Sequence, residues 1–202
     1  MSPVKATAVA RLPYNALMVT KPRVSLAKYL AMEESKPYLE LIDGDVVQKS
    51  MPGLKHSTMV VELITELRIY LRASGEARVE TELRHIERKD EWVFLPDISV
   101  TLTSRISGTP AESGGLVEVL PDFAIEVISP DDQPGRITQR IAHYMGSGVS
   151  LLWVVDPEAE RVTVWQPGKA PRDLAAPAIL SAAPVLASFE VDLSALFARL
   201  HE

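Results

Sequence analysis

The stretches LPDISV (residues 95–100) and FAIEVISP (residues 123–130) carry the clearest information about the fold. Each is short, apolar and rich in β-branched residues, and each is bounded by turn-forming residues, which is typical of a buried strand. Each also contains one acid, Asp97 in the first and Glu126 in the second. A buried carboxylate is costly to desolvate unless a cation, a hydrogen bond or a metal ion compensates it. Two such acids on consecutive strands provide the oxygen ligands that a metal site needs.

Each acid has an ordinary interpretation when it is taken singly, one as a helix N-cap and the other as a buried acid satisfied by hydrogen bonds. As a pair, on neighbouring strand-like segments, Asp97 and Glu126 favour a metal-dependent nuclease. The two interpretations differ in one respect that a structure can show, because a shared metal site requires both carboxylates to enter the same cleft.

Composition limits the class of protein. The chain has 202 residues, 47% of them hydrophobic and 24% charged, which suits one globular domain. It has no cysteine, which excludes disulfides, thiolate zinc sites and cysteine nucleophiles. No apolar run reaches membrane-spanning length, so we expect a cytoplasmic protein without a membrane partner. The net charge of −6 argues against a strongly basic nucleic-acid binder. It does not exclude a nuclease, because a locally cationic cleft can still attract nucleic acid.

Periodicity and turn signals predict the elements. Residues 1–23 read as an extended or disordered basic lead-in, and residues 24–202 as a single domain. We expect helices over about 25–34, 56–73, 138–147 and 192–200. We expect a hairpin around Asp43-Gly44 and strands over 77–87, 91–94, 97–102, 122–128, 149–156 and 161–166. Residues 104–115 and 167–187 read as loops. This order predicts an α/β fold, or an α+β fold, with a mixed sheet flanked by helices.

Five segments, in this order along the chain, resemble the Uma-type family of restriction endonucleases, a bacterial group in the PD-(D/E)xK nuclease superfamily. They are YLELIDGDVV (38–47), a proline turn leading to His56, LPDISV, FAIEVISP and RIAHYMGSGVSLLWVVDP (140–157). The resemblance extends from about residue 26 to the C-terminus. It implies a restriction-endonuclease-like core whose active site lies on adjacent strands.

The resemblance also implies roles for single residues. Asp97 matches the aspartate of the Pro-Asp motif, and Glu126 matches the second acid. Superfamily members normally have a lysine two positions after that acid, where this chain has Ile128. The Uma-type family instead has its lysine four residues before the tyrosine of its Tyr-x-x-x-Gly-Val segment, and this chain has Arg140 there. Without the resemblance, Arg140 reads as a surface helix arginine.

Two further site residues follow from the same resemblance. Glu40 alone reads as a solubilising residue on an edge strand, and the resemblance makes it a carboxylate behind the metal ligands or on a second ion. His56 alone reads as a solvent-facing helix residue, and the resemblance makes it a ligand for metal, water or phosphate. Asp97, Glu126 and the Val127 carbonyl would hold Mg²⁺, for which Mn²⁺ could substitute.

Together with the paired acids, the resemblance implies a magnesium-dependent endonuclease acting on DNA, and a homodimer by analogy with the superfamily. Arg140 keeps a second interpretation open, because arginine supplies positive charge but cannot deprotonate water at neutral pH. In that case the chain keeps the nuclease fold as a catalytically impaired DNA-binding or protein-interaction module.

Overall fold

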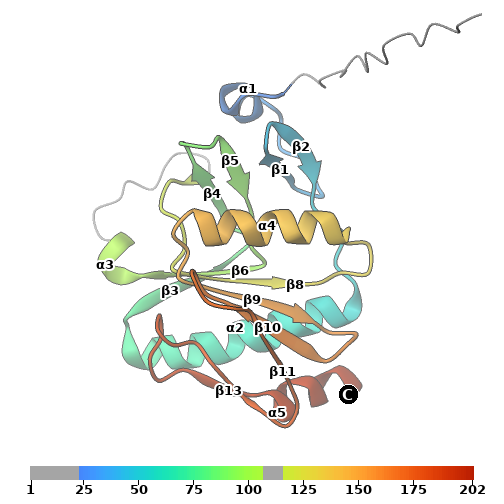
Figure 1. The fold of residues 1–202 in the computed structure, drawn as a ribbon, viewed down its shortest axis with the longest axis vertical. Helices are drawn as coiled ribbons and strands as arrows, with labels where there is room; N and C mark the ends of the chain where they lie inside the picture. The colour runs from blue at the N-terminus through green and yellow to red at the C-terminus, as the bar shows by residue number, and fades with distance from the viewer. Residues whose placement is uncertain (1–22, 107–115) are drawn as a thin grey trace, which may run out of the picture.

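The computed structural model describes residues 23–106 and 116–202, so the expected lead-in over residues 1–23 lies outside the described part except for its last residue. A six-stranded mixed sheet forms the centre of the molecule (Figure 1). Its order is β11 (Arg172–Ala175), β10 (Arg161–Trp165), β9 (Leu151–Asp156), β8 (Phe123–Val127), β6 (Ile98–Leu102) and β3 (Ala77–Thr81). Only the β8–β9 pair in this sheet is parallel.

Helix α4 (Pro134–Gly146) makes the crossover between the parallel strands β8 and β9. Parallel neighbours need such a connection, and Pro134 begins the helix where its missing N–H costs nothing. Ile137, Ile141 and Tyr144 recur at helical spacing and pack on one face of the sheet. Arg140 lies one residue from this stripe, so the packing of α4 fixes where Arg140 enters the fold.

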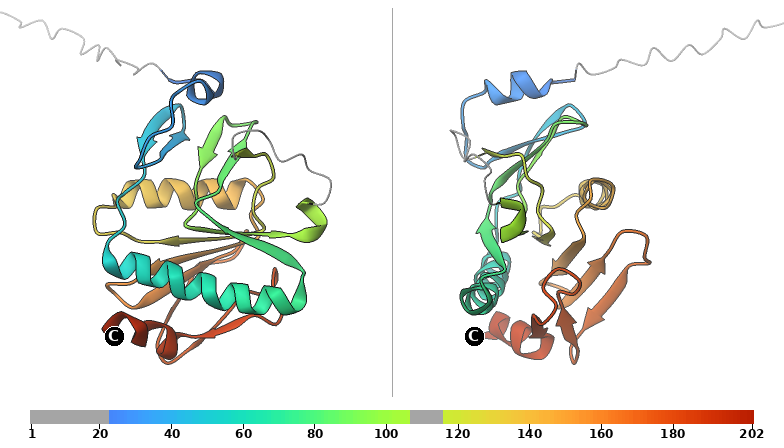
Figure 2. Two further views of the ribbon diagram at one scale, coloured as in Figure 1. Left: turned by 180° about the vertical axis from the view of Figure 1, so that it is seen from behind. Right: turned by 90° about the vertical axis from the view of Figure 1, so that its left-hand side faces the viewer.

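Helix α2 (Leu54–Ser74) covers the opposite face of the same sheet (Figure 2). Its buried stripe consists of Met59, Leu63, Leu67 and Leu71, and the helix ends at Gly75, whose φ of 66° suits glycine. Side chains of β8 alternate between the two faces: Phe123, Ile125 and Val127 join the α2 core, whereas Ala124 joins the α4 core. The same alternation turns Glu126 towards α4. Helix α5 (Leu193–Ala198), the short helix η1 (Arg199–His201) and the pair β12 (Ile179–Ser181) and β13 (Glu190–Asp192) complete the α2 side.

A second sheet lies beside the first, with helix α1 (Leu26–Leu30) packed on it. Its order is β2 (Asp45–Gln48), β1 (Leu39–Ile42), β5 (Trp92–Phe94), β4 (Arg84–Glu87) and β7 (Leu116–Val117). The predicted hairpin is confirmed, since Ile42 pairs with Asp45 and the positive φ angles of Asp43 and Gly44 suit a two-residue turn.

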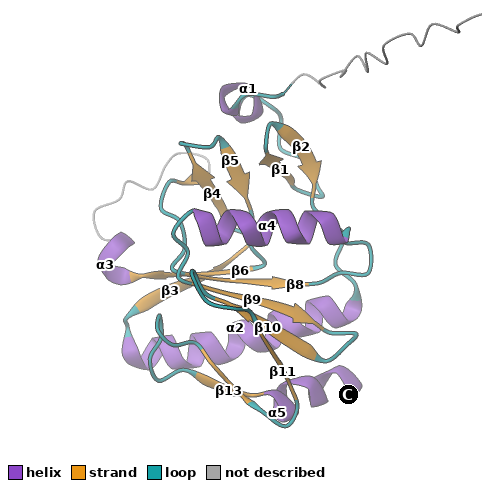
Figure 3. Ribbon diagram, in the orientation of Figure 1, coloured by secondary structure: helices purple, strands orange, loops and turns teal. Residues whose placement is uncertain are grey.

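The fold class predicted from the sequence is confirmed, and the differences are local (Figure 3). The expected strand over 77–87 is two strands in different sheets, because the chain turns at Glu82, whose φ is 49°. Helix α1 is shorter than expected, whereas α2 and α4 begin earlier. The expected loops contain short elements: α3 (Thr103–Ile106) lies in the first, and β11 and β12 lie in the second. No helix in the described ranges has the length and apolar character that a membrane crossing requires.

Candidate active site

The two predicted acids enter one pocket. In the antiparallel β6–β8 pair Ile98 lies opposite Ile125, so Asp97 and Glu126 are neighbours at the next position. The main-chain N–H of Val127 donates to Asp97 Oδ2 at 2.7 Å, which fixes the carboxylate against β8. Both acids and Arg140 line the same pocket. The structure therefore brings together Asp97, which immediately precedes β6, with Glu126 of β8 and Arg140 of α4.

A lysine that the sequence analysis did not single out contacts Asp97. Lys49 Nζ lies 2.7 Å from Asp97 Oδ1 and donates to the Leu95 carbonyl at 2.8 Å. Burial opposes the charge of this ammonium group, but Asp97 and Glu126 outweigh it and raise the pKa of Lys49 above its ordinary value. Lys49 is therefore a buried cation held against a buried carboxylate, with a side chain that is only 9% exposed.

Glu126 faces α4 and has two partners there. The Tyr144 hydroxyl donates to Glu126 Oε1, and Arg140 Nη1 lies 3.7 Å from Glu126 Oε2. Burial raises the pKa of Glu126 to about 7, although the neighbouring Arg140 acts in the opposite direction. This carboxyl group therefore changes its charge near neutral pH.

Arg140 forms a buried ion pair with Glu40. Glu40 has no solvent exposure, lies on β1 between β2 and β5, and also accepts from the Leu95 N–H at 3.0 Å. The interpretation of Glu40 as a solubilising residue on an edge strand is therefore wrong, because Glu40 is buried on an inner strand. The interpretation of Arg140 as a surface residue is also wrong, because its side chain is largely buried in this ion pair. Burial alone would lower the pKa of Arg140, but the neighbouring carboxylates Glu126 and Glu40 outweigh it and raise that pKa above its ordinary value. The guanidinium therefore stays positive.

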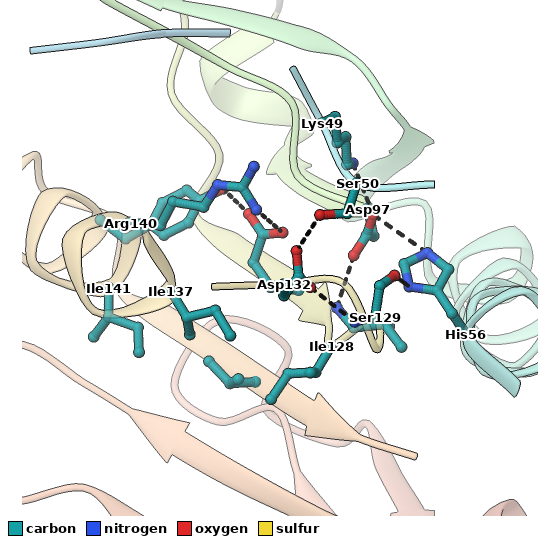
Figure 4. A pocket seen from close by; sticks show the side chains of 14 residues that line it. Lys49, Ser50, His56, Asp97, Ile128, Ser129, Asp132, Ile137, Arg140 and Ile141 are labelled. Atoms are coloured by element: carbon teal, nitrogen blue, oxygen red, sulfur yellow. Dashed lines mark hydrogen bonds and ion pairs between the residues drawn. The ribbon is translucent and has the colours of Figure 1, made fainter. Parts of the chain in front are cut away.

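His56 lies on the far side of the pocket from Arg140, as Figure 4 shows. It is the third residue of α2, and its Nδ1 lies 3.0 Å from the Ser129 hydroxyl. Its Nε2 is 3.6 Å from Asp97 Oδ1, beyond direct hydrogen-bond distance. Asp132 holds the loop after β8 in place, since it accepts from Ser129 N at 2.8 Å and from the Ser50 hydroxyl at 2.6 Å. Because its two ring nitrogens lie near Ser129 and Asp97, His56 faces the site and not the solvent.

The donor chemistry of this site fits a hard divalent cation. Asp97, Glu126 and the Val127 carbonyl offer the oxygen ligands that Mg²⁺ prefers. Among the described residues, no three histidine, aspartate or glutamate side chains already converge as a metal-ligand group. Both oxygens of Asp97 already have partners, since Lys49 faces Oδ1 and Val127 N–H faces Oδ2. An ion at Asp97 would compete with Lys49.

The sequence patterns did not predict the roles of two site residues, Lys49 and Tyr144. Lys49 follows strand β2, a position where lysine usually points into solvent, and no motif marks it. Tyr144 was visible as part of the Tyr-x-x-x-Gly-Val match and as a residue of the apolar helix stripe. Its hydroxyl contact with Glu126 depends on the crossover of α4 over β8, which local sequence does not specify.

The fold is a mixed sheet flanked by helices, and one acid just before β6 and one on β8 open into a pocket with two cationic side chains. This arrangement is that of the restriction-endonuclease-like nucleases. The chain matches the family model Uma2, described as "Putative restriction endonuclease", over residues 26–194, and it belongs to this family. A solved structure with the same fold is a "putative nuclease belonging to DUF820" from Anabaena variabilis. It shares 29% sequence identity with this chain, covers 88% of this chain and 99% of its own, and has a TM-score of 0.79. No curated protein matches this chain.

Proposed function

We propose that this protein is a magnesium-dependent endonuclease that hydrolyses phosphodiester bonds of DNA at the pocket between β6, β8 and α4. The observation that carries the proposal is the convergence of Asp97, just before β6, and Glu126, on the adjacent strand β8, in a pocket that also contains Lys49 and Arg140. The family and the fold support nuclease chemistry in general, and the site residues support the metal-dependent form of it.

Different side chains of the pocket would bind the ion, stabilise the phosphate charge and orient water. Asp97 and Glu126, with the Val127 carbonyl, would hold the divalent ion, and Glu126 must be ionised to do so. When bound, such an ion neutralises phosphate charge and makes water a stronger nucleophile. Arg140 stays positive and stabilises negative charge that develops on the phosphate. Its buried Nε–H has no acceptor among the described residues, a need that a phosphate oxygen entering the pocket would meet. His56 Nε2 is placed to orient a water molecule beside Asp97.

Cleavage of supercoiled plasmid and of single- and double-stranded oligonucleotides tests the proposal. The wild-type protein should cut at least one of these substrates with Mg²⁺ or Mn²⁺ and lose this activity in EDTA. Asp97→Asn and Glu126→Gln should each lower the rate about 100-fold or more, because each removes a charged ligand of the divalent ion that would stabilise the transition state. Asp173→Asn is the matched control, since Asp173 is exposed on β11, where it bonds to Thr163. Equal cleavage by Asp97→Asn and wild type would refute the assignment of the site.

A second candidate function is a DNA-binding module with the nuclease fold. It is favoured by Arg140 at the position of the family lysine and by the pairing of Asp97 with Lys49. A gel-shift assay of wild type, Arg140→Lys and Arg140→Ala, run beside the cleavage assay, separates the two functions. A nuclease limited by Arg140 should cut faster as Arg140→Lys, whereas a binder should lose DNA affinity in both variants without gaining cleavage. The homodimer stays a prediction, which light scattering on the purified protein would check.

A further inference from the structure

Lys49 occupies a position that the proposed metal site would need. Its ammonium group lies 2.7 Å from Asp97 Oδ1, and the other Asp97 oxygen accepts from Val127 N. Another possible ligand atom, His56 Nε2, lies 3.6 Å from the same Oδ1. A cation from solution would therefore compete with Lys49 for Asp97 Oδ1.

The remaining charges of the site also have internal partners. Arg140 pairs with Glu40 and faces Glu126, so two side-chain cations compensate three carboxylates. When all five groups are ionised, this set of side chains has one negative charge in excess, and an ionised Asp132, which also lines the pocket, adds a second. This excess is small for a site that must attract a divalent ion, because metal affinity depends on the uncompensated ligand charge.

Lys49 has space into which it can move. A second pocket of about 260 Å³ adjoins the first, and Lys49 and Ser50 line both. The second pocket is bounded further by Lys36, Tyr38 and Met51, and Met51 is 61% exposed. The flexible stem of lysine allows its ammonium group to leave Asp97 for this pocket without a change in the strands.

We propose that Lys49 is an internal competitor for the cation position beside Asp97, and that it sets the affinity of the site for divalent ions. The resting site is closed by its own lysine, and an ion enters when Lys49 turns into the adjoining pocket. The inference rests on the proposed function for the identity of the competing ion. It adds that metal affinity in this chain is determined by a residue that is not a metal ligand.

Calorimetric titration of the metal-free full-length protein with Mn²⁺ alone tests the proposal without DNA or turnover. The wild type should bind weakly, and Lys49→Met, which keeps the length of the side chain but not its charge, should bind about 10-fold or more tightly. Lys49→Arg keeps the charge and should show no such gain. Lys55→Met is the control, because Lys55 pairs with Glu158 at the surface. Adding Asp97→Asn to Lys49→Met should remove the gain.

Lys49→Gln repeats the test with a side chain that can still donate to Asp97, in case Lys49→Met does not fold. Equal or weaker Mn²⁺ binding by the folded neutral variant would overturn the proposal. Micromolar Mn²⁺ binding by the wild type that is lost in Asp97→Asn would overturn it without any Lys49 variant. Tighter binding without cleavage would refute the proposed function alone, whereas metal-dependent cleavage with unchanged binding in Lys49→Met would refute this inference alone.

Discussion

Arg140 of α4 and Glu40 of β1 form a buried ion pair, although they lie 100 residues apart in the sequence. Glu40 belongs to the second sheet and Arg140 to the helix that crosses the first, so the pair joins the two sheets at the candidate active site. Arg140 also faces Glu126 at 3.7 Å. The second sheet therefore contributes directly to the electrostatics of the site and is more than a cover for it.

This ion pair can be measured by a double-mutant cycle. Arg140→Met should lower the free energy of unfolding by about 3–5 kcal/mol, because it leaves the Glu40 carboxylate buried without its cation. Glu40→Gln should also destabilise the protein, whereas the double variant should lose less than the sum, with a coupling of about 1–3 kcal/mol. Urea unfolding at neutral pH provides all four free energies. Strictly additive losses would show that the two side chains do not interact in solution.

The two acids of the pocket should respond to neutralisation in opposite ways. Asp97→Asn should destabilise the protein by about 2–5 kcal/mol, because Lys49 would remain buried without a carboxylate. Glu126→Gln at pH 8 should leave stability unchanged or raise it, because burial disfavours the charged form of Glu126 and glutamine can still accept from Tyr144. Thermal and urea unfolding of both variants checks the contrast. A loss of equal size in both would show that Glu126 is stabilised by its charge.

Cleavage should rise with pH around neutrality. Burial raises the pKa of Glu126 to about 7, and the protonated acid is a poor metal ligand. The rate should therefore increase between about pH 6 and about pH 8 and then level off. Tyr144→Phe removes a hydrogen bond to the carboxylate and should move the profile to higher pH by about 0.5–1 unit. A profile that is flat over this range, or unmoved in Tyr144→Phe, would contradict this role of Glu126.

Stability should fall in acid through a histidine outside the site. Burial lowers the pKa of His85 to about 4, against 6.5 for an ordinary histidine. Between about pH 6.5 and pH 4 this histidine is protonated in the unfolded chain but stays neutral in the folded protein. Stability that is present above about pH 6.5 is therefore lost as the pH falls towards 4. His85→Gln should remove about 2–3 kcal/mol of this acid dependence. The control His201→Gln changes an exposed histidine, and urea unfolding at pH 7.5 and pH 4.5 should show no such effect there.

Local patterns were sufficient for most of the architecture. Alternation and turn residues predicted the β1–β2 hairpin, and helical spacing predicted α2 and α4 to within a few residues, because these signals lie within one element. The break at Glu82 was not predictable, since it depends on β3 and β4 pairing in different sheets. The strands β11 and β12 were also missed, because their residues are mostly exposed and their pairing partners supply the order.

By itself, the sequence singled out two acids of the site, because Asp97 and Glu126 stand in apolar segments where an uncompensated charge would be too costly. Only the tertiary structure decided what compensates them. Lys49 reaches Asp97 from the end of β2, and Arg140 reaches Glu40 and Glu126 from α4. Charge compensation depends on distances of a few ångströms between segments far apart in the chain, and those distances exist only after the two sheets and α4 have packed together.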